Sequence, residues 1–490
     1  MEQSTSPTPG SGFLNATEFR AILKVFIPLS IEGLGSVGIG LTDMIMVGWL
    51  GTNSLAAVGL FSAIYGFIGT IASGTLFQTL VFISQARGGG RLRIVPRIIW
   101  QAIWICVIWS VLTCVVLWNL EAILVLAGQD AIIAWMVGSY GSYFLWQVFQ
   151  KYTSSVFSFV LLAMGRATAL PFIIWSQLAL NAILNYVLIF GKFGFPEMGL
   201  MGAALASVIV VSIGQMALFG VLVYHRFFSS SALFLHFWRP RWTTLGLFFR
   251  LGWPRSIRQL LLGGMYSAAT LLAGWLGVQA LASHVMVYQI VSVATNVIST
   301  PLSKGITAYM GVIMGQRNHA GMWTALNSSL FILLLFVLPL VVILQLFSPL
   351  LVELFVGSDS KAYLLLSATA GPLFVIASFF ILVNGLQKVV SHALHGLSDV
   401  KVPVLIAVLA YWGVGVTTGV VLGFVMDGGV LGLWFGLTIG MIAAASALFM
   451  RFRWVVRRIQ AGESLAKHRH LPPQIRITKT MAHQVRIPVQ

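Results

Sequence analysis

This sequence of 490 residues has few charged side chains. Only 8% of its residues are charged and 58% are apolar, whereas a soluble domain carries about 25% charged residues. So few charges cannot cover the surface of a water-soluble protein of this length. The two cysteines, Cys106 and Cys114, lie eight residues apart on one predicted helix, about 12 Å along its axis. This separation excludes a disulfide within the chain.

The sequence also lacks the motifs of ATP hydrolysis and of enzyme chemistry. It contains no glycine-rich phosphate loop, no cluster of zinc ligands and no nucleophile triad. His468 and His470 flank Arg469 in a polar tail, where solvated side chains are expected rather than metal ligands. We therefore expect neither an enzyme nor an ATP-driven pump, and no bound cofactor.

Long apolar runs dominate the sequence instead. Charged residues are missing from 98–120, 318–352 and 428–450, and about 20 apolar residues suffice to cross the hydrocarbon core of a bilayer. Dividing the chain at clusters of Gly, Pro and charge predicts twelve membrane-spanning helices. They are expected over residues 21–48, 54–84, 98–118, 132–156, 168–190, 200–224, 248–275, 280–312, 323–346, 363–394, 402–425 and 430–451.

The net charge of +17 is concentrated in alternate loops, which indicates a membrane protein with positive loops inside the cell rather than a nucleic-acid groove. One set of loops contains Arg87, Arg91, Arg93, Arg97, Arg226, Arg239, Arg241, Arg250, Arg255 and nine Lys or Arg residues from Arg451 onward. The other set contains Glu121, Asp130, Glu197, Glu353, Asp359 and Asp427, with only Lys192 and Lys361. Both termini are therefore expected in the cytoplasm.

The two halves of the chain repeat each other. Residues 28–32, PLSIE, are echoed by PRSIR at 254–258, and GWLGTNSLA at 48–56 by GWLGVQALA at 274–282, both at an offset of 226. Gly199 and Gly202 match Gly429 and Gly432 at an offset of 230. Because each half holds six predicted helices, this repetition is typical of transporters built from parallel repeats.

We therefore predict an all-α integral membrane protein in which twelve transmembrane helices form two six-helix bundles, related by a pseudo-twofold axis along the membrane normal. The predicted parts are an N-terminal tail at 1–19, the first bundle at 20–225, a linker at 226–247, the second bundle at 248–453 and a basic tail at 454–490. A channel is less consistent with this duplication, because no segment resembles a carbonyl filter.

Two acidic residues of the twelve, Glu32 and Asp43, fall inside a predicted helix. A carboxylate within the bilayer is costly unless it is neutral, paired or in contact with water, and so it marks a functional site. Their separation of 11 residues places both on one face of the first helix, roughly 16 Å apart. Asp43 lies in the outer half of the membrane and Glu32 nearer the cytoplasm. Pairing with a neighbouring helix is the structural alternative for each.

Asn181 and Asn185 are spaced i,i+4 on the fifth predicted helix and share a face. Asn185 lies at the same depth as Asp43, so the amides are expected to bind this carboxylate or an ion. Hydrogen bonding between helices is the alternative interpretation.

The second half is basic where the first half is acidic. Ala269 is the repeat partner of Asp43, and Arg258 is that of Glu32. Further polar residues near the cytoplasmic side are Lys304, Lys388, His392 and His395, several of which are expected to extend to the lipid headgroups. The candidate residues of a substrate cavity are Glu32, Gln147, Arg258, Asn384 and Lys388.

Ordered motifs over about residues 19–453 make the chain resemble the multidrug and toxic compound extrusion (MATE) transporters. They are Pro28 with TDMIMVGWLG (42–51), SLAAVGL (54–60), MGRATALP (164–171), LNAILNYVLIFGKFGFPEMGLMGAALAS (180–207), LGWP (251–254), LGVQALASH (276–284), MGQ (314–316) and LHGLSDVKVP (394–403). The resemblance implies two bundles around a central cavity that opens alternately to each side of the membrane.

The resemblance also implies an ion-coupling site. Asp43 stands where the family has a first-helix carboxylate that is protonated or binds the ion. Asn181 and Asn185 match a polar pair on the fifth helix, Tyr140 a tyrosine on the fourth, and Ser207 a threonine on the sixth. Sodium-coupled members also carry carboxylates in the second bundle, where this chain has Leu262 and Asn384. This departure leaves H+ or Na+ at Asp43 as the coupling ion.

Together these observations predict a secondary active antiporter that exports drugs, toxins or natural products in exchange for H+ or Na+, through alternating access. We expect a monomer in a bacterial inner membrane, with lipid and a small-molecule substrate as its partners, contributing to antibiotic resistance. Two other transport functions stay open, a lipid-linked saccharide flippase and an exporter dedicated to an anionic metabolite. A scaffold or receptor would not explain duplicated halves with a buried carboxylate.

Overall fold

A computed structural model describes residues 16–224, 239–348, 350, 353 and 361–461, with the backbone alone described at 361–370. Residues 1–15, residues 225–238 with most of the predicted linker (226–247) and Arg226, and residues 462–490 with His468 and His470 lie outside the described residues. The helices extend beyond the predicted bundle limits, because the first begins at Ala16, the seventh predicted helix begins at Trp242 and the last ends at Gln460.

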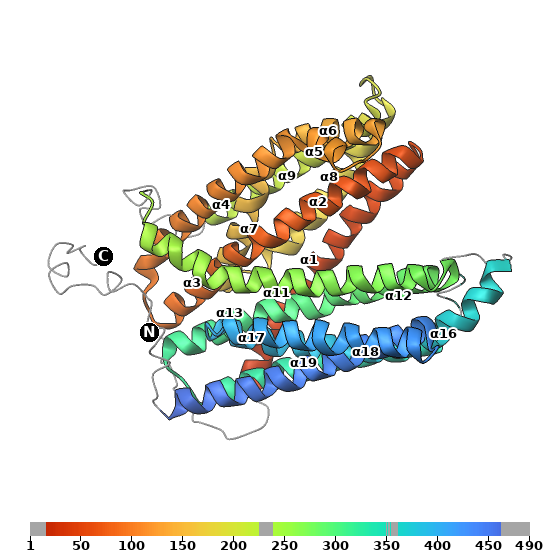
Figure 1. Ribbon diagram of the computed structural model, residues 1–490. Coiled ribbons are helices and arrows are strands. Elements are labelled where there is room, and N and C mark those ends of the chain that lie inside the picture. The colour runs from red at the N-terminus through yellow and green to blue at the C-terminus, as the bar shows by residue number, and fades with distance from the viewer. Residues whose placement is uncertain (1–15, 225–238, 349, 351–352, 354–360, 462–490) are drawn as a thin grey trace.

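Helices account for both halves of the chain (Figure 1). The first half contains α1 (Ala16–Gly48), α2 (Thr52–Leu76), α3 (Gln78–Gly88), η1 (Leu92–Ile94), α4 (Val95–Trp118), α5 (Leu120–Leu126), α6 (Ala131–Phe144), α7 (Val148–Ala163), α8 (Ala169–Phe190) and α9 (Gly199–Val223). The second contains α11 (Trp242–Trp275), α12 (Val278–Ala294), η2 (Thr295–Ser299), α13 (Thr300–Gln316), α14 (Gly321–Leu346), α16 (Lys361–Gly396), α17 (Lys401–Ala407), η3 (Val408–Val416), α18 (Thr417–Val420), η4 (Val421–Val425) and α19 (Gly429–Gln460).

Within the described residues, ten helical stretches are long and apolar enough to cross a membrane. The other two predicted spans differ for separate reasons. The continuous helix predicted over 132–156 is wrong at residues 145–147, where a turn separates α6 from α7. The span in α11 carries Arg250, Arg255 and Arg258, and these charges lower its mean hydropathy.

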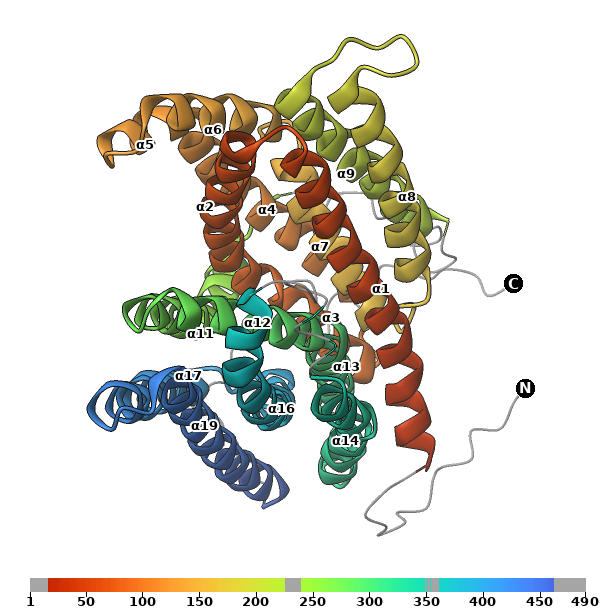
Figure 2. The same cartoon turned by 90° about the vertical axis from the view of Figure 1, so that its right-hand side faces the viewer.

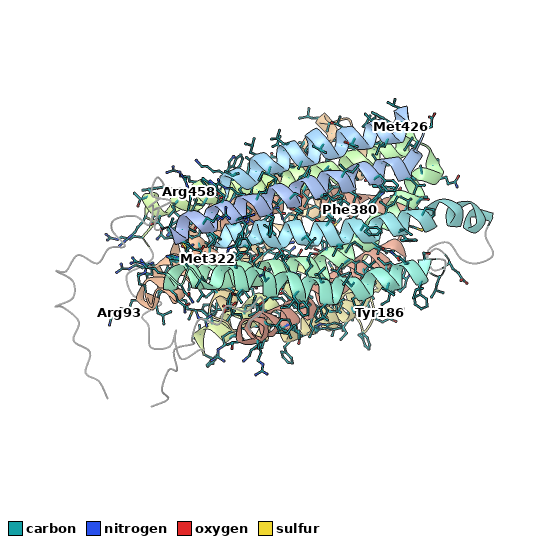
Figure 3. All side chains as sticks on the ribbon, turned by 90° about the horizontal axis from the view of Figure 1, so that it is seen from below. Arg93, Tyr186, Met322, Phe380, Met426 and Arg458 are labelled. Carbon is teal, nitrogen blue, oxygen red and sulfur yellow. The ribbon has the colours of Figure 1, made fainter. Side chains whose placement is uncertain are left out.

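The two halves form two bundles that meet at one end and diverge toward the other (Figure 1). The end where α1 begins and α19 ends is called the closed end, and the opposite end the open end. Figure 3 shows Arg93 and Arg458 at the closed end and Tyr186 and Met426 at the open end. The predicted basic segments at 87–97 and 451–458 therefore each place a side chain at the same end of the molecule.

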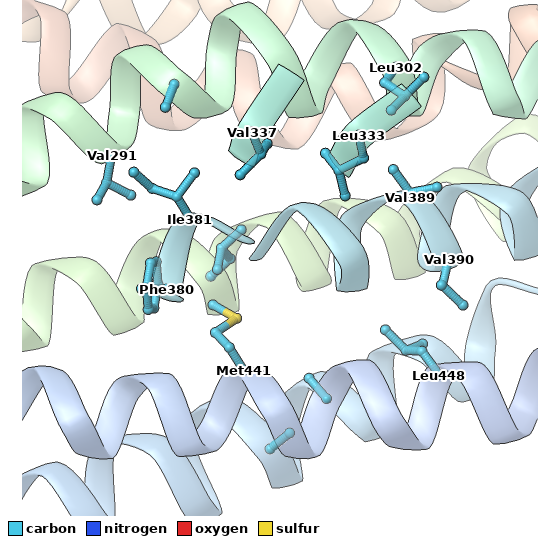
Figure 4. Close-up of a cluster of buried hydrophobic side chains, with 14 of the residues drawn as sticks. Val291, Leu302, Leu333, Val337, Phe380, Ile381, Val389, Val390, Met441 and Leu448 are labelled. Carbon is cyan, nitrogen blue, oxygen red and sulfur yellow. The ribbon is translucent and has the colours of Figure 1, made fainter. Parts of the chain in front are cut away.

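Each bundle has its own apolar core. In the second bundle, α12, α13, α14, α16 and α19 contribute close-packed aliphatic and aromatic side chains, among them Val291, Leu333, Phe380 and Met441 (Figure 4). The start of α1 departs from the first bundle, because Ile22 and Phe26 belong to the second core. Figure 2 shows this part of α1 beside α13 and α14.

The start of α11 makes the converse exchange, because Leu245 and Phe248 belong to the core of the first bundle. The start of α1 therefore packs in the second bundle and the start of α11 packs in the first, so these two helices connect the bundles. Both opening helices also contain an internal proline, Pro28 in α1 and Pro254 in α11, which interrupts the helical hydrogen-bond ladder.

Backbone geometry confirms the internal repeat. Gly51 and Gly277 precede the second helix of each half with nearly equal dihedrals, φ 106° and 111°, a region open to glycine but strained for other residues. A Cβ atom at Gly202 would clash with the carbonyl of Leu188, and one at Gly432 would clash in the same way with the carbonyl of Leu422. Glycine is therefore required at equivalent positions of both halves.

The paired glycines lead to a stability prediction. We expect Gly202→Ala and Gly432→Ala each to destabilise the protein by about 1–3 kcal/mol, because the added methyl group meets backbone that cannot move independently. Thermal unfolding of the purified variants in detergent measures the effect. Gly59→Ala is the matched control, since a Cβ atom at this helical position has open space around it. Variants as stable as Gly59→Ala would contradict the predicted close packing.

Candidate functional site

The side chains of Asp43, Asn181 and Asn185 meet between α1 and α8. The Asn181 Nδ2 group donates a hydrogen bond to Asp43 Oδ1 at 2.9 Å, and the Asn185 Nδ2 group donates to the same oxygen at 2.7 Å. Both amides are fully buried, whereas Asp43 is half-buried. The i,i+4 spacing on α8 brings both amides to one carboxylate oxygen, as the sequence pattern predicts.

Two further residues predicted beside Asp43 lie on neighbouring helices. Tyr140 is buried on α6, packs against Phe61 and Phe144 with ring centroids 5.0 Å away, and lies within electrostatic range of Asp43. Ser207 is half-buried on α9 and forms no hydrogen bond with Asp43. The carboxylate is therefore held directly by the two amides of α8, with a buried aromatic cluster nearby.

Gln147 lies in the turn that separates α6 from α7. Its side chain is buried, and its Oε1 atom has no hydrogen-bond partner among the described residues. The sequence favoured this residue for a cavity, and the structure places it at the interruption of a predicted span.

Glu32 lines a cavity between the two bundles. The cavity has a volume of about 450 Å³ and is bounded by α1 on one side and by α12, η2 and α13 on the other. Lys304 lies on the opposite wall, together with Asn296 and Thr300. Glu32 and Lys304 therefore give a single cavity walls of opposite charge, which suits a small polar or charged ligand.

Hydrogen bonds and close backbone packing also join the two bundles directly. The Gln85 side chain of α3 donates to the Gly396 carbonyl and to Ser398 Oγ, each at 3.0 Å. Ser256 Oγ of α11 donates to the Ile71 carbonyl at 2.6 Å. Close approach of backbone at Gly74 and Gly252 brings α2 and α11 together here. The structure thus represents a conformation that is sealed at the closed end.

Polar side chains of the second bundle form a buried network. Lys388 Nζ donates to Thr300 Oγ1 at 2.8 Å, and Asn384 Nδ2 donates to Thr295 Oγ1 at 3.1 Å. Tyr411 donates to Gln387 Oε1 at 3.0 Å. The sequence did not single out Tyr411 and Gln387, because each appears there only as an isolated polar residue within an apolar helix.

The expectation that the basic side chains of the second bundle extend to the headgroups is wrong for Lys388, His392 and His395. All three are buried, with 8%, 3% and 1% of their surface exposed. They lie on the faces of α16 that pack against α13 and the first bundle, where His392 and His395 contact the Phe77 ring. Arg258 is buried as well, with 1% exposed.

The fold and site define a polytopic membrane transporter, with two repeated bundles, a carboxylate held within the first and a cavity between them. Known proteins agree with this class. The MatE family profile matches residues 28–187 and 254–421. The chain is 34% identical over 450 residues to the probable multidrug resistance protein NorM of Rhizobium meliloti, covering 91% of this chain and 95% of the relative. It is 32% identical to the multidrug resistance protein NorM of Burkholderia vietnamiensis, covering 88% and 92%.

Solved structures share the same fold. A MATE transporter of the MOP superfamily in an outward-facing conformation superposes with a TM-score of 0.81 at 20% identity, covering 90% of this chain and 97% of that structure. A mutant of the Vibrio cholerae MATE transporter VcmN also gives 0.81 at 20% identity, covering 90% and 98%. The chain belongs to the MATE family. This membership confirms the predicted fold of two six-helix bundles and the predicted transporter function, and the protein is not an enzyme.

Proposed function

We propose that this transporter exports small, drug-like organic molecules and couples their export to protons at Asp43. The observation that carries the proposal is the pair of hydrogen bonds from Asn181 and Asn185 to a single Asp43 oxygen. Both donors stabilise the carboxylate form, and protonation of Asp43 removes its negative charge and so weakens the two hydrogen bonds that join α1 to α8. A change in protonation can therefore shift the equilibrium between two arrangements of the bundle.

The surroundings of Asp43 favour a proton over Na+. Transporters bind Na+ with backbone carbonyls from unwound helices, but α1 and α8 are continuous helices around Asp43, Asn181 and Asn185. Both amides present N–H groups to the carboxylate. Within the described residues, no group of three or more His, Cys, Asp or Glu side chains gathers around a possible metal ion.

The closed end is proposed to face the cytoplasm, with both termini on that side. Arg93 and Arg458 lie at this end (Figure 3), and cytoplasmic loops carry the excess of Lys and Arg. The conformation is then open toward the outside, which is the state in which an exporter releases substrate and takes up the coupling ion. We further propose a monomer in the inner membrane of a bacterium, as two bundles of one chain enclose the cavity.

The choice of coupling ion can be tested with purified protein in proteoliposomes. We expect an imposed pH gradient to drive transport of a fluorescent dye substrate without Na+, because only Asp43 needs to exchange an ion. Each pH unit of the gradient adds about 1.36 kcal/mol of driving force per proton. Dye accumulation is followed by fluorescence, with a protonophore as control. Transport driven only by a Na+ gradient would contradict proton coupling. Movement of fluorescent lipid instead of dye would favour a flippase.

A further inference from the structure

Three cations of the second bundle are buried close together. Arg255 and Arg258 lie on α11 with 7% and 1% of their surface exposed, and Lys388 lies on α16 with 8% exposed. The three charges repel one another: Lys388 interacts electrostatically with both guanidinium groups, and Arg255 interacts with Arg258. This set, Arg255, Arg258 and Lys388, is called the cationic cluster.

Within the part of the chain that the structure describes, the cationic cluster has no carboxylate partner. The sequence contains no Asp or Glu from Met198 to Val352, which includes all of α9, α11, α12, α13 and α14. Among the described residues of the remaining second-bundle helices and turns, Glu353 is exposed, Asp399 is paired with Arg451 at 2.7 Å and Asp427 lies in the turn before α19. The described residues of the second bundle therefore do not balance the positive charge of the cluster.

Several donor atoms of the cluster are buried without a hydrogen-bond partner among the described residues. They are Nε and Nη1 of Arg255, and Nε and Nη2 of Arg258. The Tyr411 hydroxyl lies beside Arg258, but it adds no negative charge. Because arginine cannot lose its proton in a protein, a buried and unpaired guanidinium is unfavourable unless an anion joins it.

Histidine and hydroxyl groups complete the surroundings. His392 and His395 lie one turn apart on α16 with ring centroids 5.4 Å apart, and both interact with the arginine charges. Thr307 on α13 donates to the His392 carbonyl at 2.9 Å. Thr300, which accepts the hydrogen bond of Lys388, also lines the cavity that contains Glu32 and Lys304. The cluster therefore adjoins the cavity between the bundles.

We propose that the cationic cluster is a binding site for the carboxylate or phosphate group of a small organic anion. The planar guanidinium groups of Arg255 and Arg258 match the paired oxygens of such groups, and Lys388 adds a third charge toward the cavity. This inference rests on the proposed export function and specifies its substrate class: molecules with an anionic group bind in the second bundle, while Asp43 exchanges the proton in the first.

The first bundle covers this site in the present conformation. The Arg255 guanidinium carbon lies 3.2 Å from the centre of the Phe77 ring, and Phe77 belongs to the contact between bundles at the closed end. An anion thus gains full access to the guanidinium groups when Phe77 moves away. Anion binding therefore favours separation of the bundles at the closed end, as expected for loading substrate from that side.

The test uses full-length protein in phosphatidylcholine nanodiscs, with citrate and inorganic phosphate as probes at constant ionic strength. Isothermal titration calorimetry should detect binding of at least one probe to the wild type. We expect Arg255→Gln and Arg258→Gln to weaken it about 10- to 100-fold, as for loss of a hydrogen bond to a charged group. Arg250→Gln is the matched control, since Arg250 is exposed on the same helix.

Thermal unfolding provides a second measurement that separates binding from misfolding. Without a probe anion, Arg258→Gln should unfold at a higher temperature than the wild type, because it removes an unpaired buried charge. With citrate or phosphate, the wild type should gain stability and Arg258→Gln should not. Equal probe binding by wild type and both Gln variants, or no binding of either probe to the wild type, would overturn the proposal.

Two further arms separate the possible interpretations. Nanodiscs containing phosphatidylglycerol show whether a lipid headgroup is the anion, because the lipid phosphate would then compete with citrate at the cluster. Asp43→Asn should bind the probes as the wild type does. If that variant binds them and still transports with ion coupling, the proposed role of Asp43 fails while the anion site stands. If the Gln variants bind normally, the anion site fails and proton coupling is unaffected.

Discussion

Asp43→Asn is expected to reduce gradient-driven export to the background rate of empty liposomes. Asparagine cannot alternate between a neutral and a negatively charged form, so the change removes the one group that we propose exchanges the ion. The amide still offers an oxygen to Asn181 and Asn185, which donate to Asp43 at 2.9 and 2.7 Å. Insertion and folding should therefore persist, with the thermal midpoint changed by no more than about 4 °C, or about 1 kcal/mol.

Dye efflux from proteoliposomes under an imposed gradient measures this effect. Asp427→Asn is the matched control, since it makes the same chemical change in the turn before α19, where φ is 53° and asparagine is readily accommodated. The control should transport at the wild-type rate. Undiminished coupled transport by Asp43→Asn would disprove the assignment of the coupling site.

Gly252→Ala should disturb the conformational equilibrium. A Cβ atom at residue 252 would meet the backbone of Thr75, 2.8 Å from its nitrogen, and the Gly74 carbonyl at 2.9 Å. Because these are backbone atoms on the opposing helix, α2 and α11 have to move apart to accept the methyl group. Overpacking of this kind costs about 1–3 kcal/mol. If this cost falls only on the sealed conformation, it raises the ratio of open to sealed molecules about 5- to 150-fold.

The shift can be followed with a cysteine at residue 84. Ser84 is fully buried on α3, where its Cβ faces Gly311 of α13, so Ser84→Cys should react with a maleimide only when the closed end opens. Cys106→Ala and Cys114→Ala remove the native thiols from the background. Gly252→Ala should accelerate labelling and slow transport. Gly263→Ala, on the same helix but with open space around its Cβ, should change neither. Equal labelling in both variants would contradict the prediction that a methyl group at residue 252 separates α2 from α11.

Several features of the fold were predictable because they depend on local composition. Apolar length and charge spacing locate the spans, and the repeated motifs predict equivalent backbone at Gly51 and Gly277. The interruption at residues 145–147 was not predictable, since this Leu-Trp-Gln segment contains no glycine, proline or charged residue that would mark a turn. The exchange of opening helices also escaped prediction, because nothing in the sequence around Ile22 or Leu245 specifies which bundle receives the side chain.

The candidate coupling site was predictable to a similar degree. Helical periodicity alone places Asn181 and Asn185 on one face, and the rarity of acidic residues isolates Asp43. The surroundings of Lys388 could not be predicted, because a basic residue near a helix end can either extend to the lipid headgroups or turn toward the protein interior. Packing of α16 between α13, α14 and α19 removes the outward route and leaves the side chain buried.

The sequence by itself determined that the chain lives in a membrane, that it is duplicated and that one half carries the lone acidic pair, since these follow from composition and spacing along the chain. The tertiary structure alone decided which end is sealed, that Glu32 and Lys304 line opposite walls of one cavity, and that Lys388 lies beside Arg255 and Arg258. Such relations join residues far apart in the sequence, and their energies depend on packing and burial, which no local pattern encodes.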